Sequence, residues 1–280
     1  MKKFLVVFDG YKMSESSMHY AIQLTQAENA HLVGVFLDEI MYRTYSVYDV
    51  MTNNKDYQKK IDALDASDQE KRDDSVRKFQ EACESAKIKF SIHRDRNIAL
   101  QELKHESIFA DLVIINEYEA FSGVTQPAPT GFIKELLGDV QCPVLITPAA
   151  FRKIDRIVLL YDGKPNSLYA IKIFSYLLDT MTQLPAEVLM VKEKKVPGSH
   201  LPDNKLVKEF IKRHFPKAAY TVLKGDAEQE ITKHLRSCPA NVLVVLGAYR
   251  RSDLSRWFKT SMADVLMQSL DTPLFIAHNK

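Results

Sequence analysis

The sequence contains little glycine, only nine among 280 residues. A protein that cradles phosphates in several glycine-rich loops has to concentrate its glycines there, and this chain for the most part does not. The sequence also lacks an excess of charge of one sign. It contains 38 Lys and Arg residues and 36 Asp and Glu residues, which gives a formal net charge of +2. Bulk charge therefore gives no indication of nucleic-acid binding, and we expect none.

Cysteine and long apolar runs are scarce as well. Cys83, Cys142 and Cys238 are widely spaced and form neither a CxxC pair nor a disulfide framework. This spacing is typical of a reducing environment, so a cytoplasmic location is expected. No apolar run approaches the roughly 18 residues of a membrane span, so we expect no contact with a membrane. The apolar run at 4–8 ends at Asp9 and is too short for the core of a signal peptide.

Motifs of metal binding and catalysis are missing too. The eight histidines show no HExxH motif and no Cys/His cluster. No GxSxG motif, Walker loop or nucleophile–base pair is present. We therefore expect no metal site and no catalytic residue, and we predict that the protein is not an enzyme.

The chain instead contains the same order of signals twice. Asp9-Gly10 and Asp162-Gly163 each follow an apolar run, 153 positions apart (162 minus 9). Near the end of each half, Pro143 and Pro273 each precede an apolar run, 130 positions apart (273 minus 143). The offsets differ by about 23 residues, which predicts a duplicated domain with an insertion in the first copy near 39–67. The expected domains are 1–150 and 151–280.

Each half alternates between short β-branched apolar runs and helical spacing. The near-continuous apolar runs are typical of strands buried on both faces, and their order predicts two tandem Rossmann-like domains. Each would hold a five-stranded, doubly wound parallel sheet with about four helices, of the α/β class. The expected strands are 4–8, 31–37, 88–92, 111–115 and 143–147, then 156–160, 186–191, 218–222, 241–246 and 273–277.

Helix boundaries follow from polar and apolar spacing. Ser14 and Asn166 are the expected capping residues of the first helix in each half. The stretch Leu168–Leu178 is apolar nearly all round, so we expect it to be buried on more than one side, at the contact between the domains.

Open sheets of this type bind ligands beyond the carboxyl ends of their strands, where the strand order reverses. In the second half, Asp162 ends the first strand and Gly247 ends the fourth. Gly247 permits a tight turn or a close backbone approach, and Thr260 and Ser261 are placed to cap the next helix, whose N-terminus favours anions. Asp9 and Asp162 either contact a ligand or are held by backbone amides at the strand-to-helix turn.

These residues resemble the universal stress protein family, in a tandem two-domain form with an adenine nucleotide α-hydrolase-like fold. The resemblance covers nearly the whole chain outside 39–67. Nucleotide-binding members carry Gly-x2-Gly-x9-Gly-Ser/Thr after the fourth strand, where the motif holds ATP phosphates. In the second half Gly247, Arg250 and Thr260 stand at the glycine positions and Ser261 at the hydroxyl position, with Asp162 as the strand acid.

The first half departs further from the motif. Asp9 remains, but Asn116 and Glu119 replace the first two glycines, and Thr130 or Gly131 holds the hydroxyl position. A side chain at a glycine position blocks close approach of the backbone to phosphate. We therefore expect no bound cofactor, with ATP possible in the second domain only. The Arg250 guanidinium offers another way to hold a phosphate there.

Two segments carry alternatives. Arg250, Arg251, Arg256 and Lys259 surround Trp257 and Phe258, which is typical either of a contact with an anion or single-stranded RNA, or of a solvated loop. The insertion forms either a surface for a partner or a lid over its own domain, because it is rich in aromatic and methionine side chains: Met41, Tyr42, Tyr45, Tyr48, Met51 and Tyr57. Its later part, 56–68, continues into a charged stretch that predicts a long helix.

Three functions fit the sequence. The first is a non-catalytic cytoplasmic stress-response protein that acts through binding or regulation with protein partners, its nucleotide binding weakened or lost. The second is an ATP-binding, slowly hydrolysing switch that uses the second domain alone. The third, a nucleotide-dependent enzyme of the same sheet class, lacks any recognisable catalytic base. The family resemblance also implies that the two domains pair within one chain, and a homodimer is possible.

Overall fold

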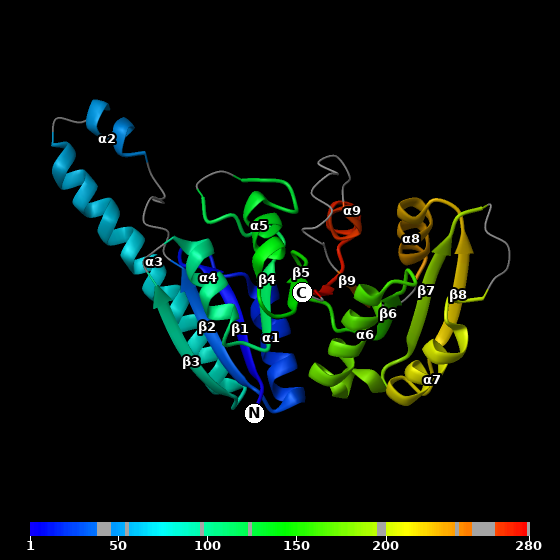
Figure 1. The fold of residues 1–280 in the computed structure, drawn as a ribbon. Coiled ribbons are helices and arrows are strands. Elements are labelled where there is room, and N and C mark those ends of the chain that lie inside the picture. The colour runs from blue at the N-terminus through cyan, green and yellow to red at the C-terminus, as the bar shows by residue number, and fades with distance from the viewer. Residues whose placement is uncertain are drawn as a thin grey trace.

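The computed structural model describes residues 1–37, 46–53, 56–95, 98–122, 125–194, 200–238, 241–247 and 261–278. Strands and helices alternate along this part of the chain (Figure 1). The strands are β1 (Lys3–Asp9), β2 (His31–Leu37), β3 (Lys89–Asp95), β4 (Leu112–Asn116), β5 (Val144–Thr147), β6 (Arg156–Leu160), β7 (Ala186–Lys192), β8 (Ala219–Lys224), β9 (Val242–Gly247) and β10 (Leu274–Ala277). Each overlaps one of the ten expected strands.

The helices occupy the segments between the strands. They are α1 (Glu15–Glu28), α2 (Val47–Asn53), α3 (Tyr57–Ser85), α4 (Ala99–Ser107), α5 (Gly131–Asp139), α6 (Pro165–Leu177), the 3-10 helix η1 (Asp179–Gln183), α7 (Asn204–His214), α8 (Ala227–Arg236) and α9 (Met262–Ser269). None of these described helices has both the length and the apolar character that crossing a membrane requires.

The strands form one continuous sheet in the order β3-β2-β1-β4-β5-β10-β9-β6-β7-β8. Within each half all neighbouring strands are parallel, and the order reverses direction next to the first strand, as in other doubly wound sheets. The α/β class and the two five-stranded parallel halves expected from the sequence are confirmed.

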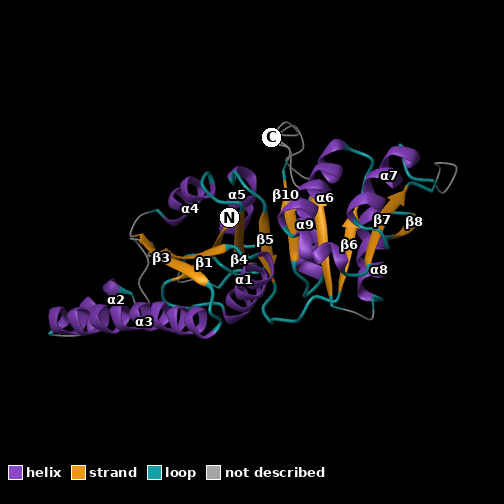
Figure 2. Ribbon diagram, turned by 90° about the horizontal axis from the view of Figure 1, so that it is seen from below, coloured by secondary structure: helices purple, strands orange, loops and turns teal. Residues whose placement is uncertain are grey.

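The two halves meet where β5 and β10 pair antiparallel. Leu274 lies opposite Ile146, Phe275 opposite Leu145 and Ile276 opposite Val144. This single antiparallel ladder joins the two parallel sheets into one (Figure 2). Because the strand direction reverses there, the carboxyl ends of the strands in the two halves lie at opposite ends of the shared sheet.

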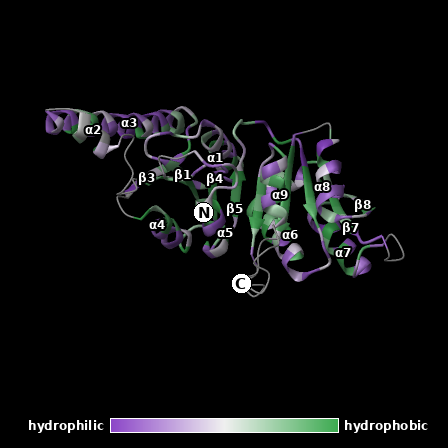
Figure 3. Ribbon diagram, turned by 90° about the horizontal axis from the view of Figure 1, so that it is seen from above, coloured by the Kyte–Doolittle hydropathy of each residue, from purple (hydrophilic) through white to green (hydrophobic). Residues whose placement is uncertain are grey.

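Each face of the sheet carries one apolar core that runs through both halves. Successive side chains of a strand point to opposite faces, so Phe4, Val6 and Phe8 belong to one core while Leu5 and Val7 belong to the other. Helices α1, α3, α6 and α7 cover the first face, and α4, α5, α8 and α9 cover the second. Figure 3 shows the apolar strands between helices whose outer surfaces are more hydrophilic.

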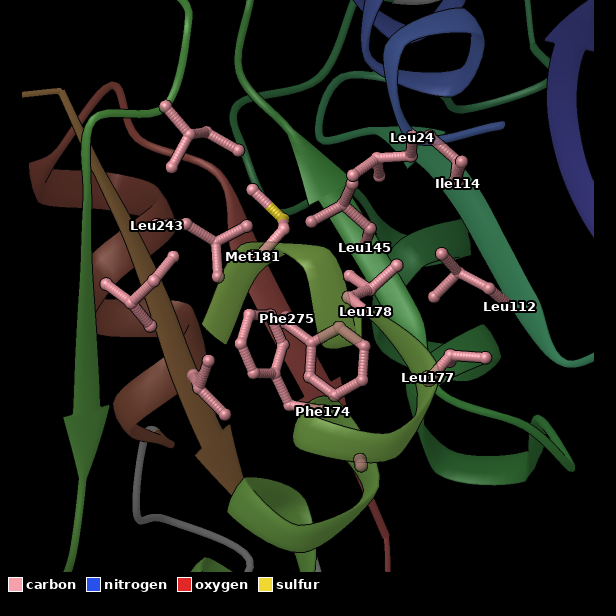
Figure 4. Close-up of a cluster of buried hydrophobic side chains, with 14 of the residues drawn as sticks. Leu24, Leu112, Ile114, Leu145, Phe174, Leu177, Leu178, Met181, Leu243 and Phe275 are labelled. Carbon is pink, nitrogen blue, oxygen red and sulfur yellow. The ribbon is translucent and has the colours of Figure 1, made fainter. Parts of the chain in front are cut away.

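The C-terminal end of α6 packs at the contact between the halves. Phe174 and Leu177 of α6, with Leu178 and Met181 just beyond, lie beside Leu24, Ile114 and Leu145 of the first half (Figure 4). Polar contacts continue this seam: Lys2 Nζ lies 2.6 Å from Glu28 Oε2 and 3.2 Å from Asp179 Oδ1. The expectation that this apolar helix reaches the domain contact thus holds for its last turn and the residues after it.

Of the two expected helix caps, one is confirmed and one is wrong. Ser14 is the N-cap of α1, and its hydroxyl accepts a hydrogen bond from Ser17 N at 3.2 Å. In the second half the N-cap is Lys164, and Asn166 lies inside the first turn. Pro165 is the reason, because its fixed backbone angle suits the first helical position and it needs no N–H partner there.

The insertion contains α2 and the beginning of α3. Helix α2 and the N-terminal part of α3 project beyond the sheet (Figures 1 and 2), while the C-terminal part of α3 packs on it, and α2 packs on α3. The described part therefore does not form a lid, and the side chain of Tyr48 is 75% exposed. The expected long helix is present as the 29-residue α3. Its residue Arg72 donates to the Tyr11 hydroxyl in the β1–α1 loop, so α3 also supports the carboxyl end of β1.

Phe275 is the residue whose removal should test the shared core. It is fully buried in β10, and its ring centroid lies 5.1 Å from that of Phe174. We expect Phe275→Ala to lower the free energy of unfolding by about 3–5 kcal/mol, because it leaves a cavity beneath the seam. Urea denaturation followed by circular dichroism measures this, and both halves should unfold in one transition.

The matched control is Tyr176→Ala, since the Tyr176 side chain is 58% exposed on α6. It should change the free energy of unfolding by less than about 0.5 kcal/mol. Two separate transitions in Phe275→Ala, with the first half unaffected, would contradict the continuous core.

Candidate functional site

A cavity lies at the carboxyl ends of the strands in each half. The cavity of the first half has a volume of about 720 Å³ and that of the second about 620 Å³. Both volumes lie in the range of small-molecule sites, and each cavity stands beside the reversal of strand order. They therefore mark the two candidate sites, which the antiparallel seam places at opposite ends of the sheet.

The second cavity has apolar walls and a polar rim. The ends of β6, β7 and β9 contribute Leu160, Leu189 and Leu246, and α8 adds Ile231. The rim consists of Asp162, Lys164, Asn166 and Ser167 from the β6–α6 turn. The structure thus brings the predicted residues Asp162 and Gly247 to the same cavity, because both end a strand at this edge.

Asp162 is held by its own turn. Its Oδ1 accepts hydrogen bonds from Lys164 N at 2.9 Å and from the Ser167 hydroxyl at 2.7 Å. The side chain is nevertheless 57% exposed, and Oδ2 lies 4.0 Å from Lys164 Nζ. Asp162 therefore stabilises the strand-to-helix turn, which is one of the two roles expected for it. Its second carboxylate oxygen, Oδ2, remains at the rim of the cavity. Asp9 has the same local geometry, with Oδ1 accepting from Tyr11 N at 3.0 Å.

Gly247 is needed for packing between β9 and α6. A Cβ at this position would lie 2.7 Å from the carbonyl oxygen of Asn166, and a backbone atom cannot move aside as a flexible side chain does. The glycine therefore lets the end of β9 approach the first turn of α6. Its close backbone approach is to the protein's own helix.

Ser261 caps the helix that follows the fourth strand. Its hydroxyl accepts from Asp264 N at 3.1 Å, and Ser261 N donates to Asp264 Oδ2 at 3.4 Å, which forms a capping box. Met262, the first residue of α9, lines the second cavity. The N-terminus of α9 therefore stands at the cavity with an acidic side chain already bonded to it.

Two predicted site residues, Arg250 and Thr260, lie outside the described residues. The same holds for Arg251, Arg256, Trp257, Phe258 and Lys259, so the alternatives for this basic and aromatic segment stay predictions.

Acidic side chains crowd the first cavity. Asp9, Glu15 and Glu119 line it together with Lys12 and Asn116. Burial raises the pKa of the Glu119 carboxyl well above its ordinary value, and the charge of Asp9 raises it further. The raised pKa favours the neutral form of Glu119, so the negative charge that a phosphate would meet here comes from Asp9 and Glu15, with Lys12 beside them.

The remaining predicted residues of the first half serve the structure of the loop. Asn116 is buried and its amide donates to the carbonyl oxygens of Thr147 and Pro148. Thr130 is the N-cap of α5 and accepts from Ile133 N at 3.3 Å. Gly131 is the first helical residue, and its N–H donates to Gln126 Oε1 at 3.0 Å. Thr130, and not Gly131, is thus the counterpart of Ser261.

Among the described residues, no group of three or more His, Cys, Asp or Glu side chains is placed to hold a metal ion. The surroundings of the thiols also disfavour the reactive thiolate form. Burial raises the pKa of Cys83 to about 12 and raises that of Cys238, and Cys142 is buried. Among the residues that the structure describes, neither cavity is lined by a His or Cys side chain.

The sequence matches no protein-family model. It also matches no curated protein. The structure does resemble solved proteins along its full length. A universal stress protein from Archaeoglobus fulgidus DSM 4304 is similar with a TM-score of 0.68 at 14% identity, over 99% of this chain and 98% of that one. The chain has the fold of a tandem universal stress protein.

Two further structures of this fold come from Pseudomonas aeruginosa. A functionally unknown protein from strain PAO1 has a TM-score of 0.57 at 14% identity, and the similarity covers 99% of this chain and 92% of that one. A protein from strain UCBPP-PA14, described as a candidate universal stress protein, has a TM-score of 0.54 at 14% identity over 99% and 93% of the two chains. At this identity the likeness concerns the universal stress fold and not the ligand.

Sequence reasoning missed Asp264 and Glu117, and gave Asn166 another role. Asp264 had a signal, because Ser261 followed three positions later by an acid is a capping-box pattern. Asn166 was assigned as a cap and instead lines the second cavity. Nothing in the sequence marks Glu117, an acid that only the packed seam buries to 2% exposure.

We expect Gly247→Ala to lower the free energy of unfolding by about 1–3 kcal/mol, because the new methyl group overlaps the α6 backbone. Thermal or urea denaturation measures the loss. The control is Gly138→Ala in α5, where a Cβ meets nothing within 4 Å. That change should be neutral or stabilising by up to about 1 kcal/mol, since alanine is the better helix former. Equal effects of the two variants would refute the close approach.

Glu117 should make the stability depend on pH. Burial, and then the charge of Asp271 across the seam, raise its pKa to about 8. In the unfolded chain the pKa of this glutamate is about 4.3, so as the pH rises the unfolded state releases the proton at lower pH than the folded state does. The free energy of unfolding therefore falls as the pH rises from about 4 to about 8. Glu117→Gln removes the part of this fall that Glu117 causes, while Glu119 still contributes its own part, and the variant should be more stable than the natural protein at pH 8 by on the order of 2 kcal/mol.

Urea denaturation of both proteins at pH 4.5, 6 and 8 measures the difference. Glu135→Gln, an exposed change on α5, is the matched control and should show no such trend. A constant difference between Glu117→Gln and the natural protein across pH would disprove the assignment.

Proposed function

We propose that this chain is a non-catalytic stress-response protein that acts by binding and regulation through protein partners. Nucleotide binding is lost in its first half and weakened in its second. The fold supports the general role, because full-length similarity to a universal stress protein extends over both halves. The state of the two cavities supports the loss of nucleotide binding.

One observation carries this proposal. In both halves two backbone amides at the N-terminus of the last helix, where a phosphate would bind, donate to side chains of the chain itself. In the first half, at the start of α5, Gly131 N donates to Gln126 Oε1 and Ile133 N donates to the Thr130 hydroxyl. In the second half, at the start of α9, Asp264 N donates to the Ser261 hydroxyl and Ser261 N donates to the Asp264 carboxylate. A phosphate has to displace these bonds before it gains its own.

The cavities fit other parts of a nucleotide unequally. The second has apolar walls that suit a base, and Asp162 at its rim suits a ribose hydroxyl. The first has the Asp9 carboxylate at its wall, which opposes negative charge. ATP, when bound, would supply a hydrolysable phosphate chain, and only the second half has residues that fit its nucleoside part.

The second cavity also supports an alternative function, an ATP-binding switch with slow hydrolysis in the second half alone. In this alternative the ATP phosphates have to bind at the N-terminus of α9 against the repulsion of the Asp264 carboxylate. It requires in addition a group that activates water, and the described residues of the cavity contain no His or Cys.

Nucleotide retention tests the proposal directly. The purified protein is denatured and the released small molecules are separated by chromatography. We expect far less than one nucleotide per chain, because a site with Kd of about 1 mM, near −4 kcal/mol, empties during purification. ATP recovered at one per chain, or phosphate release from added ATP, would overturn the proposal and favour the switch.

A further inference from the structure

The sheet ends in the second half at the edge strand β8, which among the described strands pairs with β7 alone. Gly225 N, just after β8, donates to the carbonyl oxygen of Lys192 in β7 at 2.9 Å. Backbone groups of successive strand residues alternate in direction, so the N–H and C=O groups of Tyr220 and Val222 point away from β7. The residues of β8 are exposed or half-buried throughout, unlike those of the inner strand β6. This edge therefore offers hydrogen-bond donors and acceptors to a further strand.

Lysines of α7 stand beside this edge. Lys205, Lys208 and Lys212 are exposed and follow the spacing i, i+3 and i+7, so they lie on one side of the helix. Lys208 Nζ lies 5.4 Å from the centroid of the Tyr220 ring, which places this side of α7 next to β8. The edge of β8 is therefore bordered by a row of positive charge.

These three lysines have no acidic partner among the described residues. Glu209, the acid within α7, pairs with Arg213 instead, at 3.4 Å between Oε1 and Nη2. The edge strand of the first half, β3, differs in this respect. Its Arg94 Nη1 lies 2.8 Å from Asp73 Oδ1 of α3. The positive charge beside β8 is thus left for a partner to neutralise.

The two halves also differ in net charge. Residues 1–150 contain 17 Lys and Arg against 23 Asp and Glu, a formal charge of −6. Residues 151–280 contain 21 Lys and Arg against 13 Asp and Glu, a formal charge of +8. The balanced total conceals a basic second half, which attracts a negatively charged partner.

The combination of a free edge and unpaired lysines restricts what can bind there. A second copy of β8 would bring its own lysines, and lysines beside an edge strand oppose the pairing of like edges. A nucleic acid carries negative charge but cannot continue the ladder of peptide hydrogen bonds. An extended acidic peptide satisfies the backbone groups and the lysines together.

We propose that the free edge of β8 binds an extended acidic segment of a partner protein as an added strand. The outward N–H and C=O groups of Tyr220 and Val222 form the new ladder. Carboxylates of the segment contact Lys205, Lys208 and Lys212 on the side of the sheet that α7 covers. This deepens the proposed function, on which it rests, by naming the class of protein partner and the surface that it meets.

Fluorescence anisotropy tests the proposal with the full chain and a labelled peptide of about ten residues that alternates Glu and Thr. We expect saturable binding that weakens as salt is added, because the charges involved are exposed. The same peptide with every backbone nitrogen methylated keeps its charge and has no N–H donor. It should bind at least ~10-fold more weakly, since strand addition needs those donors.

Two variants at one position test the backbone contact. Tyr220→Pro removes the outward N–H, and proline is tolerated in an edge strand where the N–H faces solvent. Tyr220→Thr is the matched control, because it loses the same ring and keeps the N–H. We expect the proline variant to bind the peptide at least ~10-fold more weakly than the threonine variant.

A charge reversal tests the lysines without touching the strand. Lys208→Glu should weaken peptide binding by about 10-fold, because it places a carboxylate beside the acidic segment. Lys134→Glu, an equally exposed change on α5 of the first half, should leave the affinity unchanged.

The outcomes separate this inference from the proposed function. An acidic peptide that fails to bind, or a methylated peptide that binds equally well, overturns strand addition. An oligothymidylate of the same charge that binds as tightly as the peptide makes this a nucleic-acid surface and overturns the peptide assignment. None of these results bears on nucleotide retention. ATP recovered at one per chain, with peptide binding intact, overturns the proposed function and leaves the edge of β8 as a docking surface.

Discussion

The antiparallel ladder between β5 and β10 is the interaction on which the rest of the structure depends. Three residue pairs, from Leu274–Ile146 to Ile276–Val144, join two parallel sheets that would otherwise end in exposed edge strands. Pairing buries both edges and extends each apolar core across the seam. It also reverses the strand direction, which is why the two ligand cavities open at opposite ends of the molecule and meet different surroundings.

Duplication gave the two halves the same scaffold and left their sites free to diverge. The turn after the first strand is alike in both, with Asp9 and Asp162 each accepting a backbone N–H. The residue that ends the fourth strand differs: it is the buried Asn116 in the first half and Gly247 in the second. Gly247 lets the end of β9 approach the first turn of α6.

Much of the fold follows from local patterns. Ten strands and the long helix α3 were predictable because buried parallel strands are short apolar runs and α3 keeps its helical spacing for 29 residues. The cap at Ser14 followed from its residue type, whereas the cap at Asn166 was wrong because Pro165 begins the helix one residue earlier. Of the residues predicted for the second site, Asp162 and Gly247 lie at one cavity and Ser261 caps α9, whereas its capping partner Asp264 was not predicted.

By itself the sequence determined the duplication, the strand-and-helix order and the residues that end each strand, because these depend on neighbours along the chain. Tertiary structure alone decided that Glu117 faces Asp271 across the seam, where burial raises its pKa to about 8. It likewise decided that α6, α8 and α9 all begin at one cavity. Burial and electrostatic fields arise from segments far apart in sequence, so no local pattern encodes them.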